Sequence, residues 1–122
     1  MRYARSYPGP DGESHFEDIQ VEFTPAPYVP RSPMVDLSAS TAASAATFVH
    51  LASDWYGDWY PSPRRQFNVT LSGAIEVRVS DGDVRRFGPG DVWLLEDISG
   101  KGHNLRVLDA DDWYAMLIPL AD

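Results

Sequence analysis

Residues 66–91 read QFNVTLSGAIEVRVSDGDVRRFGPGD, and this stretch decides the fold class. Polar and apolar residues alternate over 66–71 and again over 75–79, which is the period-2 pattern of half-buried β-strands. Gly73 interrupts the pattern between the two strands. The Asp-Gly pair at 81–82 predicts a hairpin, because this pair readily takes the positive φ values of a type I′ turn. A third strand is expected directly after that hairpin.

The chain after residue 47 continues as short strands separated by turns. A Gly-Pro-Gly-Asp turn at 88–91 and a Ser-Gly-Lys-Gly turn at 99–102 consist of residues that favour turns. The sequence contains no heptad pattern, no internal repeat and no convincing helix. Short strands at a spacing of about 8–12 residues predict an all-β sandwich or barrel. The further strands are expected at 48–51, 84–87, 92–95, 104–108 and 113–120.

The beginning of the chain has a different composition, because six of its ten prolines lie in the first 33 residues. Proline fixes φ and removes a backbone donor, so such a segment cannot form a continuous helix or a central strand. We expect residues 1–36 to form an extended arm with one short strand at 19–23. Residues 37–122 are expected to form the barrel. The small residues at 38–47 fit either a loop or a weak helical turn.

Composition narrows the class of protein. A chain of 122 residues makes one domain, or one domain with an arm. It contains no cysteine, which excludes disulfides, thiolate nucleophiles and Cys-ligated metal sites. Its formal net charge of −8 argues against nucleic-acid and anionic-membrane partners. No apolar run approaches the roughly 20 residues of a membrane span, and no signal sequence is apparent, so we expect a cytoplasmic protein.

Three features in this order resemble the cupins, the small jelly-roll β-barrels of the RmlC-like superfamily. They are the strand and glycine at Val69–Gly73, the turn at 88–91, and His103 a dozen residues after that turn. The resemblance implies an all-β, cupin-type double-stranded jelly-roll barrel. It also implies a homodimer. The prolines favour docking of the arm as an edge strand, on its own subunit or on the partner. The fold alone does not define a function.

The metal site of a typical cupin is the part that this chain lacks. The family offers a His-x-His pair, then a glutamate seven residues before a glycine, and a later histidine. Gln66 stands at the glutamate position, residues 59–62 contain no histidine, and only His103 remains. A transition metal needs three or four imidazole or carboxylate donors, so we expect no cofactor. The alternative is a divalent metal held by His103 with a substitute ligand, which would be Tyr60, His50 or Glu96.

The strand at 66–71 leaves two orientations open. Gln66, Asn68 and Thr70 lie on one face, and the apolar residues lie on the other. If the apolar face points to the core, the polar face is solvated. The cupin resemblance implies the opposite, with Gln66 and Asn68 lining the cavity and binding the substrate. Uncharged polar groups inside a barrel are costly unless water or a ligand satisfies them.

His103 is the first candidate for acid–base catalysis, because a histidine at a barrel mouth can exchange protons near neutral pH. His50 either pairs with it across the cavity or faces outward. Tyr60, the third catalytic candidate, belongs to a run of four large aromatics at 55–60. This run either forms a wall for a small organic ligand or a dimer interface. The remaining candidates for substrate binding are Trp59, Trp93 and Arg64.

Other charged groups contribute to chemistry only if they are buried. Lys101 could polarise a carbonyl group, and Glu96 could act as a base, with Asp97 as the second available carboxylate. His15 lies in an acidic turn. A surface position is the simpler interpretation for each of them.

Three hypotheses for the function follow. The first is a small-molecule enzyme of the isomerase, epimerase, cyclase or lyase type, of a kind found in secondary metabolism, which works without metal. In it His103 and His50 move protons and the residues above hold the substrate. The second is a non-catalytic cupin that binds a small ligand. The third is a metal-dependent enzyme that uses His103. The expected partner in all three is a small organic molecule, which the sequence does not identify.

Overall fold

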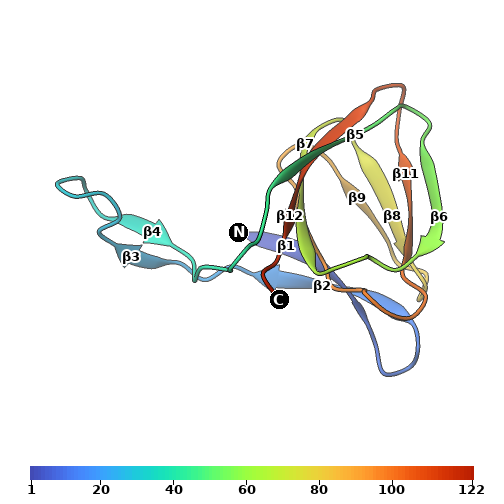
Figure 1. The fold of residues 1–122 in the computed structure, drawn as a ribbon, viewed down its shortest axis with the longest axis horizontal. Helices are drawn as coiled ribbons and strands as arrows, with labels where there is room; N and C mark the ends of the chain where they lie inside the picture. Colours follow the sequence, from blue (N-terminus) through green and yellow to red (C-terminus); the bar gives the residue numbers. More distant parts are fainter.

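The computed structural model describes residues 1–122, which form strands and loops without any helix. Two sheets face each other, and a two-stranded hairpin projects from them (Figure 1). The large sheet has the order β2-β1-β10-β7-β12-β5, and the smaller one has the order β6-β11-β8-β9. No helix capable of spanning a membrane is present. The strands are β1 (Arg2–Pro8), β2 (Ser14–Gln20), β3 (Thr24–Ala26), β4 (Val35–Leu37), β5 (Thr47–Leu51), β6 (Tyr56–Tyr60), β7 (Gln66–Ser72), β8 (Ile75–Val79), β9 (Val84–Phe87), β10 (Val92–Leu95), β11 (His103–Val107) and β12 (Trp113–Pro119).

The core lies between the two sheets and receives side chains from both. Alternation along the strands produces it, because every second residue of β8 and β11 is buried. Trp93 and Trp113 are the largest fully buried side chains on the large sheet, and Ile75 and Val77 face them from the smaller one. The predicted all-β, jelly-roll type of fold is confirmed.

The strands predicted after residue 47 are confirmed. β8, β9 and β10 have the predicted bounds, β5, β7 and β12 differ from them by one residue at one end, and β11 is shifted by one residue at both ends. β6 was not predicted, because its sequence has no alternation of polar and apolar residues. It forms because it pairs with β11, where Gly57 lies opposite Leu105.

The Asp-Gly hairpin is confirmed, but its turn is of another type. The N–H of Gly82 donates to the carbonyl of Val79 over 3.1 Å, and the N–H of Val79 donates to the carbonyl of Asp83. Gly82 has a φ of 99°, whereas neither Ser80 nor Asp81 has a positive φ. A type I′ turn needs positive φ at both central residues, so this is a type I turn followed by a left-handed glycine.

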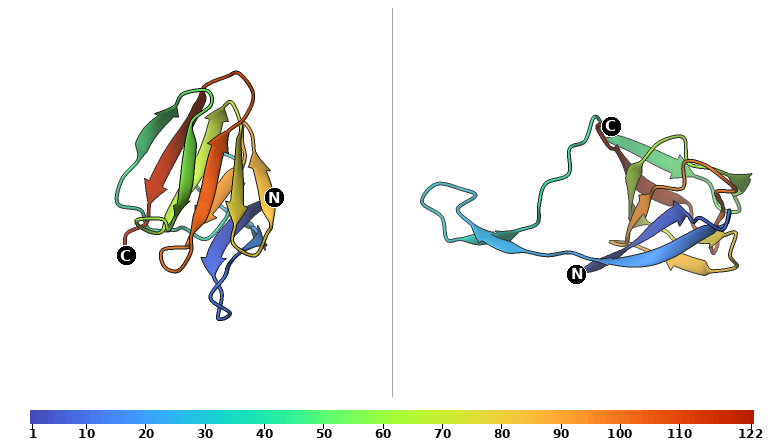
Figure 2. Two further views of the ribbon diagram at one scale, coloured as in Figure 1. Left: turned by 90° about the vertical axis from the view of Figure 1, so that its right-hand side faces the viewer. Right: turned by 90° about the horizontal axis from the view of Figure 1, so that it is seen from below.

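The strand prediction for residues 1–36 is wrong. The single strand expected at 19–23 is replaced by β1 and β2, which belong to the large sheet, and β1 pairs in parallel with β10. Most of the prolines that suggested an arm lie in the projecting hairpin of β3 and β4 instead (Figure 2). Residues 38–46 form a loop with one isolated bridge, from Ala43 to Leu120. The division of the chain into domains stays a prediction.

His15 fastens the β1–β2 hairpin to the turn between β8 and β9. Its Nδ1 lies 2.8 Å from a carboxylate oxygen of Asp81, and its Nε2 lies 2.9 Å from one of Asp11. The hydrogen bond with Asp11 raises the pKa of His15, desolvation opposes this effect, and Asp81 adds to it. A protonated imidazole can donate to both carboxylates at once. The charged form of His15 therefore holds the two hairpins together.

We predict that His15 makes the stability of the protein depend on pH. Because its pKa is raised in the folded state, its contribution is complete below the unfolded value of about 6.5. That contribution is lost as the pH rises through the folded value. The urea midpoint of the wild type should therefore approach that of His15→Gln between about pH 6 and about pH 9. A constant difference between the two midpoints over this range would contradict the prediction.

Candidate functional site

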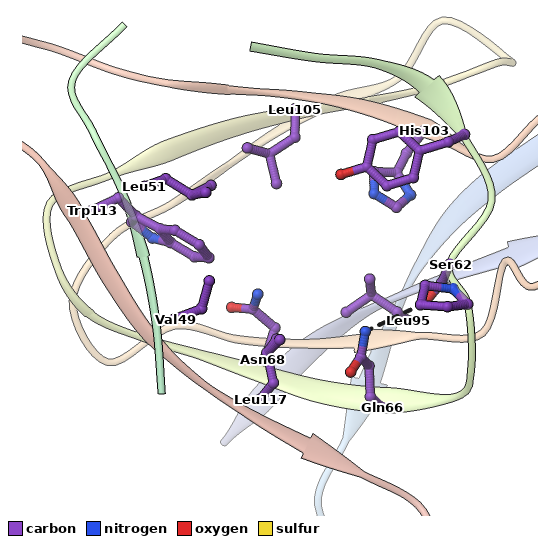
Figure 3. A pocket seen from close by; sticks show the side chains of 12 residues that line it. Val49, Leu51, Ser62, Gln66, Asn68, Leu95, His103, Leu105, Trp113 and Leu117 are labelled. Carbon is purple, nitrogen blue, oxygen red and sulfur yellow. Dashed lines mark hydrogen bonds between the residues drawn. The ribbon is translucent and has the colours of Figure 1, made fainter. Parts of the chain in front are cut away.

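A cavity of about 190 Å³ lies between the two sheets (Figure 3). Its apolar walls come from both sheets and include Leu51, Leu105 and Trp113. No lysine, arginine, aspartate or glutamate lines it. Its polar lining consists of Tyr60, Ser62, Gln66, Asn68 and His103.

β7 presents its polar face to this cavity, as the cupin resemblance implied. Gln66 and Asn68 are 8% and 4% exposed, and their amide groups point into the cavity (Figure 3). The side-chain amide of Asn68 has no hydrogen bond within the protein. The side-chain amide of Gln66 has only a long contact of 3.5 Å with the hydroxyl of Ser62. Since no fully buried side-chain nitrogen or oxygen lacks a partner, the Asn68 amide reaches open space. Thr70 faces inward as well, but it accepts a hydrogen bond from Trp113.

His103 begins β11 and is held by a chain of buried hydrogen bonds. Its Nδ1 lies 2.6 Å from Oδ2 of Asp97, and the hydroxyl of Ser6 donates to Oδ1 of Asp97 over 2.8 Å. Nε1–H of Trp93 donates to Ser6 over 2.9 Å. Asp97 is 0% exposed and His103 is 2% exposed. The two side chains form a buried carboxylate–imidazole pair.

This pair leaves one nitrogen of His103 available. A carboxylate accepts hydrogen bonds, so Nδ1 of His103 carries the proton, an assignment inferred from the hydrogen bond. Nε2 has no partner within the protein, and no fully buried polar atom lacks one, so Nε2 opens on the cavity. An unprotonated Nε2 backed by a carboxylate is the arrangement of a general base.

A close approach of two loops sets the position of His103. The Cα of Gly102 lies against the backbone of Tyr60, so that a Cβ there would come within 2.1 Å of the Tyr60 carbonyl oxygen. Gly102 also has a φ of 70°, which other residues rarely adopt. In the same region the N–H of Ser62 donates to the carbonyl of Asp97 over 2.9 Å. Gly102 thus lets β6 lie beside the start of β11.

Tyr60 lies beside His103, with 5.0 Å between the ring centroids. Burial, and after it the negative charge of Asp97, raise the pKa of the Tyr60 phenol. The phenol therefore stays protonated near neutral pH and can donate a hydrogen bond. The sequence analysis had assigned Tyr60 to the site, and the structure brings it to the cavity together with Gln66, Asn68 and His103.

Four predicted site residues lie elsewhere. His50 faces outward, pairs with Asp112 over 2.8 Å and stacks on Tyr114, so it cannot meet His103 across the cavity. Trp59 lies in an exposed surface hollow with Lys101. Arg64 lies on the surface near the end of the chain, because it precedes β7 and does not follow its alternation. Trp93 is buried behind His103 and supports Ser6 without lining the cavity.

The two carboxylates that follow β10, Glu96 and Asp97, lie in different surroundings. Glu96 points away from the cavity and is held by Arg5 and by Arg65, the latter at 2.6 Å. Burial would raise the pKa of Glu96, but its hydrogen bonds to the two arginines outweigh burial and lower the pKa. Lys101 is exposed and pairs with Glu13. Asp97 was predicted only as an available carboxylate, and its pairing with His103 was not predicted. Ser6 was not predicted at all, because only the parallel pairing of β1 with β10 brings it close.

The residues at the family's ligand positions do not fit a divalent metal. Tyr60 and Ser62 have the spacing of the His-x-His pair, and both line the cavity with Gln66 and His103. Only His103 among them is a common transition-metal ligand, and its Nδ1 is engaged by Asp97. The hydroxyl of Ser62 donates to the carbonyl of Arg64. No three His, Asp or Glu side chains cluster as a metal site needs.

Comparisons with known proteins agree with this fold. No protein-family model and no curated protein matches the sequence. The cupin domain of Cnp3 from Schizosaccharomyces pombe is similar in structure, with a TM-score of 0.54, 15% identity, and coverage of 89% of this chain and 73% of that chain. A sugar phosphate isomerase of the cupin superfamily from Silicibacter pomeroyi has a TM-score of 0.51 and 13% identity, covering 100% and 71%. The protein therefore has the cupin fold, which confirms the resemblance read from its strands and turns.

We predict that His103 is present as the Nδ1–H tautomer. Imidazole ¹⁵N spectra of the neutral ring in the wild type should show a protonated Nδ1 and an unprotonated Nε2. In Asp97→Asn the amide can donate to Nδ1 instead of accepting from it, so the Nε2–H form should gain population. Identical spectra for the wild type and Asp97→Asn would contradict the proposed hydrogen bond.

Proposed function

We propose that this protein is a small-molecule enzyme that works by acid–base chemistry without a metal, of the isomerase, epimerase, cyclase or lyase type. The observation that carries the proposal is the Asp97–His103 pair with Nε2 of His103 open to the cavity. Each of these reaction types has members that begin with removal of a proton, which Nε2 of His103 is placed to accept. The absence of the usual metal ligands around His103 supports a role for this histidine as a base.

Asp97 supports His103 as a base in two ways. It fixes the tautomer, so that the unprotonated Nε2 faces the substrate. It also stabilises the imidazolium that forms when Nε2 takes a proton, as a buried carboxylate does in other histidine-dependent enzymes. Ser6 holds Asp97 in turn over 2.8 Å. Asp97 and Ser6 are positioning residues, because neither lines the cavity.

The amides of Gln66 and Asn68 complete the proposed site. When His103 breaks a C–H bond next to a carbonyl group, the electron pair moves onto the carbonyl oxygen. An amide N–H of Asn68 or Gln66 can donate to that oxygen and stabilise its charge. The imidazolium then returns the proton to a second carbon or to a leaving group. It returns the proton to the same carbon with inversion only if the planar intermediate turns over in the cavity. No oxidant or reductant is required for this sequence.

The lining favours a small, uncharged substrate. A volume of about 190 Å³ is below the roughly 300 Å³ at which pockets for drug-sized ligands begin. The absence of lysine and arginine from the walls leaves no permanent cation to bind a phosphate or carboxylate. The similar protein from Silicibacter pomeroyi is a sugar phosphate isomerase. We therefore propose a different substrate here, with one carbonyl group and an apolar body.

We predict that His103→Gln lowers the catalysed rate by about 10²–10⁴-fold. A practical assay incubates the protein in D₂O with a panel of small cyclic ketones and follows exchange of the α-protons by ¹H NMR. His15→Gln is the matched control. His15 lies on β2 and does not line the cavity, so this change should leave the rate unchanged. Exchange at the wild-type rate in a folded His103→Gln protein would overturn the assignment of the base.

A non-catalytic binding protein is the second candidate, favoured by the largely apolar lining. In that case His103→Gln would alter ligand affinity, and no ligand that binds would be turned over. Measuring binding and exchange of the same ketones distinguishes the two functions. Tight binding without exchange would support the binding protein.

We predict that removal of metal ions leaves the activity unchanged. Wild-type protein dialysed against EDTA should keep its exchange rate, because Gln66, Tyr60 and Ser62 replace the expected metal ligands. Metal analysis of the protein before dialysis serves as the control. A loss of activity that a divalent metal restores would instead support the metal-dependent enzyme.

A further inference from the structure

The cavity between the two sheets has two ends of different chemistry (Figure 3). One end, called the polar end here, carries hydrogen-bonding side chains and consists of Ser62, Gln66 and His103. The opposite end, called the apolar end, consists of Val49, Leu51 and Trp113. The place where a proton can move is thus separate from the place where an apolar group can be buried.

The apolar end offers no free hydrogen-bonding group to a ligand. Trp113 is 2% exposed, and its side-chain N–H donates to the hydroxyl of Thr70 over 3.2 Å. Thr70 itself does not line the cavity, and the side chains of Val49 and Leu51 have no polar atoms. A polar group placed here would lose its hydrogen bonds to water without replacement, whereas an apolar group gains by leaving water.

Leu51 is the part of the apolar end that can change in size at the smallest cost to the fold. It lies directly opposite Trp113 in the pairing of β5 with β12. β5 is the last strand of the large sheet, so its outer edge has no strand partner. Leu51 is only partly buried, whereas Trp113 belongs to the central core. The side chain of Leu51 therefore limits the space in front of the indole ring.

β7 relates the two ends to the proposed reaction. Gln66 at the polar end precedes Thr70 by four residues, which corresponds to about 13 Å at 3.3 Å a residue. Asn68 lies midway, and its amide points into the cavity (Figure 3). A carbonyl group that accepts from Asn68 while its α-carbon faces His103 has polar side chains on one side. Its apolar body then lies on the other side, towards Trp113.

The volume limits that body to one small ring. The cavity measures about 190 Å³. An engineered apolar cavity of about 150 Å³ in another protein binds benzene. A six-membered ring that carries a carbonyl group therefore fills the space, and a second fused ring has no room.

We propose that the apolar end is a specificity site for the ring of a monocyclic ketone, and that Leu51 sets the largest ring that the cavity admits. The identity of the reacting end rests on the proposed function. Binding of the ring does not require that the reaction takes place. Leu51 determines specificity and takes no part in the proton transfer.

A series of ring sizes tests the proposal. The dissociation constants of cyclopentanone, cyclohexanone, cycloheptanone and cyclooctanone are measured by NMR titration. In the wild type the affinity should rise about fourfold from the five-membered to the six-membered ring. It should fall for the eight-membered ring, which exceeds the space.

Two changes at position 51 should move this preference in opposite directions. Leu51→Ala should favour cyclooctanone over cyclohexanone by about tenfold more than the wild type does. Leu51→Phe should weaken the binding of cyclohexanone relative to cyclopentanone. Leu71→Ala is the matched control, because Leu71 is 48% exposed and lies on the outer face of β7. Circular dichroism checks that each variant is folded.

Exchange of the α-protons, followed on the same samples, separates this proposal from the proposed function. A shifted ring preference without any exchange would support the specificity site and contradict the enzyme. Exchange with the same ring preference in the wild type, Leu51→Ala and Leu51→Phe would support the enzyme and overturn the specificity site. A wild type that binds none of the four ketones would overturn the specificity site as well.

Discussion

The buried carboxylate of Asp97 is the group on which both the fold and the candidate site depend. A carboxylate out of contact with water is costly unless hydrogen bonds satisfy it. Asp97 receives one from Ser6, near the start of the chain, and one from His103, near its end. The parallel pairing of β1 with β10 is the arrangement that brings Ser6 within reach. The hydrogen bonds that form around Asp97 when the barrel folds are therefore also the ones that orient the imidazole of His103.

The glutamine at position 66 fits the proposed metal-free site for a physical reason. In a cavity without a cation, a glutamate at this position would be an unpaired charge in a low-dielectric interior. Gln66 keeps the shape of that side chain and its capacity for hydrogen bonds, and it removes the charge. With Asn68 beside it, the cavity is lined by neutral polar groups and a single imidazole, that of His103.

The sequence predicted the barrel well where local patterns determine structure. Alternation identified β7 and β8, and the Asp-Gly pair located the hairpin between β8 and β9. The cupin register placed Gln66 and Asn68 inward, which alternation alone left open. The predicted turn type at residues 81–82 was wrong, because Asp-Gly occurs in both two-residue and three-residue hairpin loops.

The failures concern contacts between distant parts of the chain. The high proline content led to the prediction of an arm in place of β1 and β2. Composition was averaged over residues 1–36, which contain both the β1–β2 pair and the projecting hairpin. Ser6 was consequently assigned to an arm, and the hydrogen bonds of Asp97 were not foreseen. His50 and Arg64 were misplaced because the direction of a side chain depends on the register of its strand, and in these segments no alternation fixed the register.

The pairing of β1 with β10 also bears on how the molecule is made. Ala4 lies opposite Trp93, so the partners are 93 − 4 = 89 residues apart. During synthesis the first strand leaves the ribosome long before its neighbour exists, and closing so large a loop slows folding. The nascent chain must therefore keep one edge of β1 unpaired through most of translation, with β2 as its only neighbour, and the polar and charged side chains of this hairpin are suited to that delay.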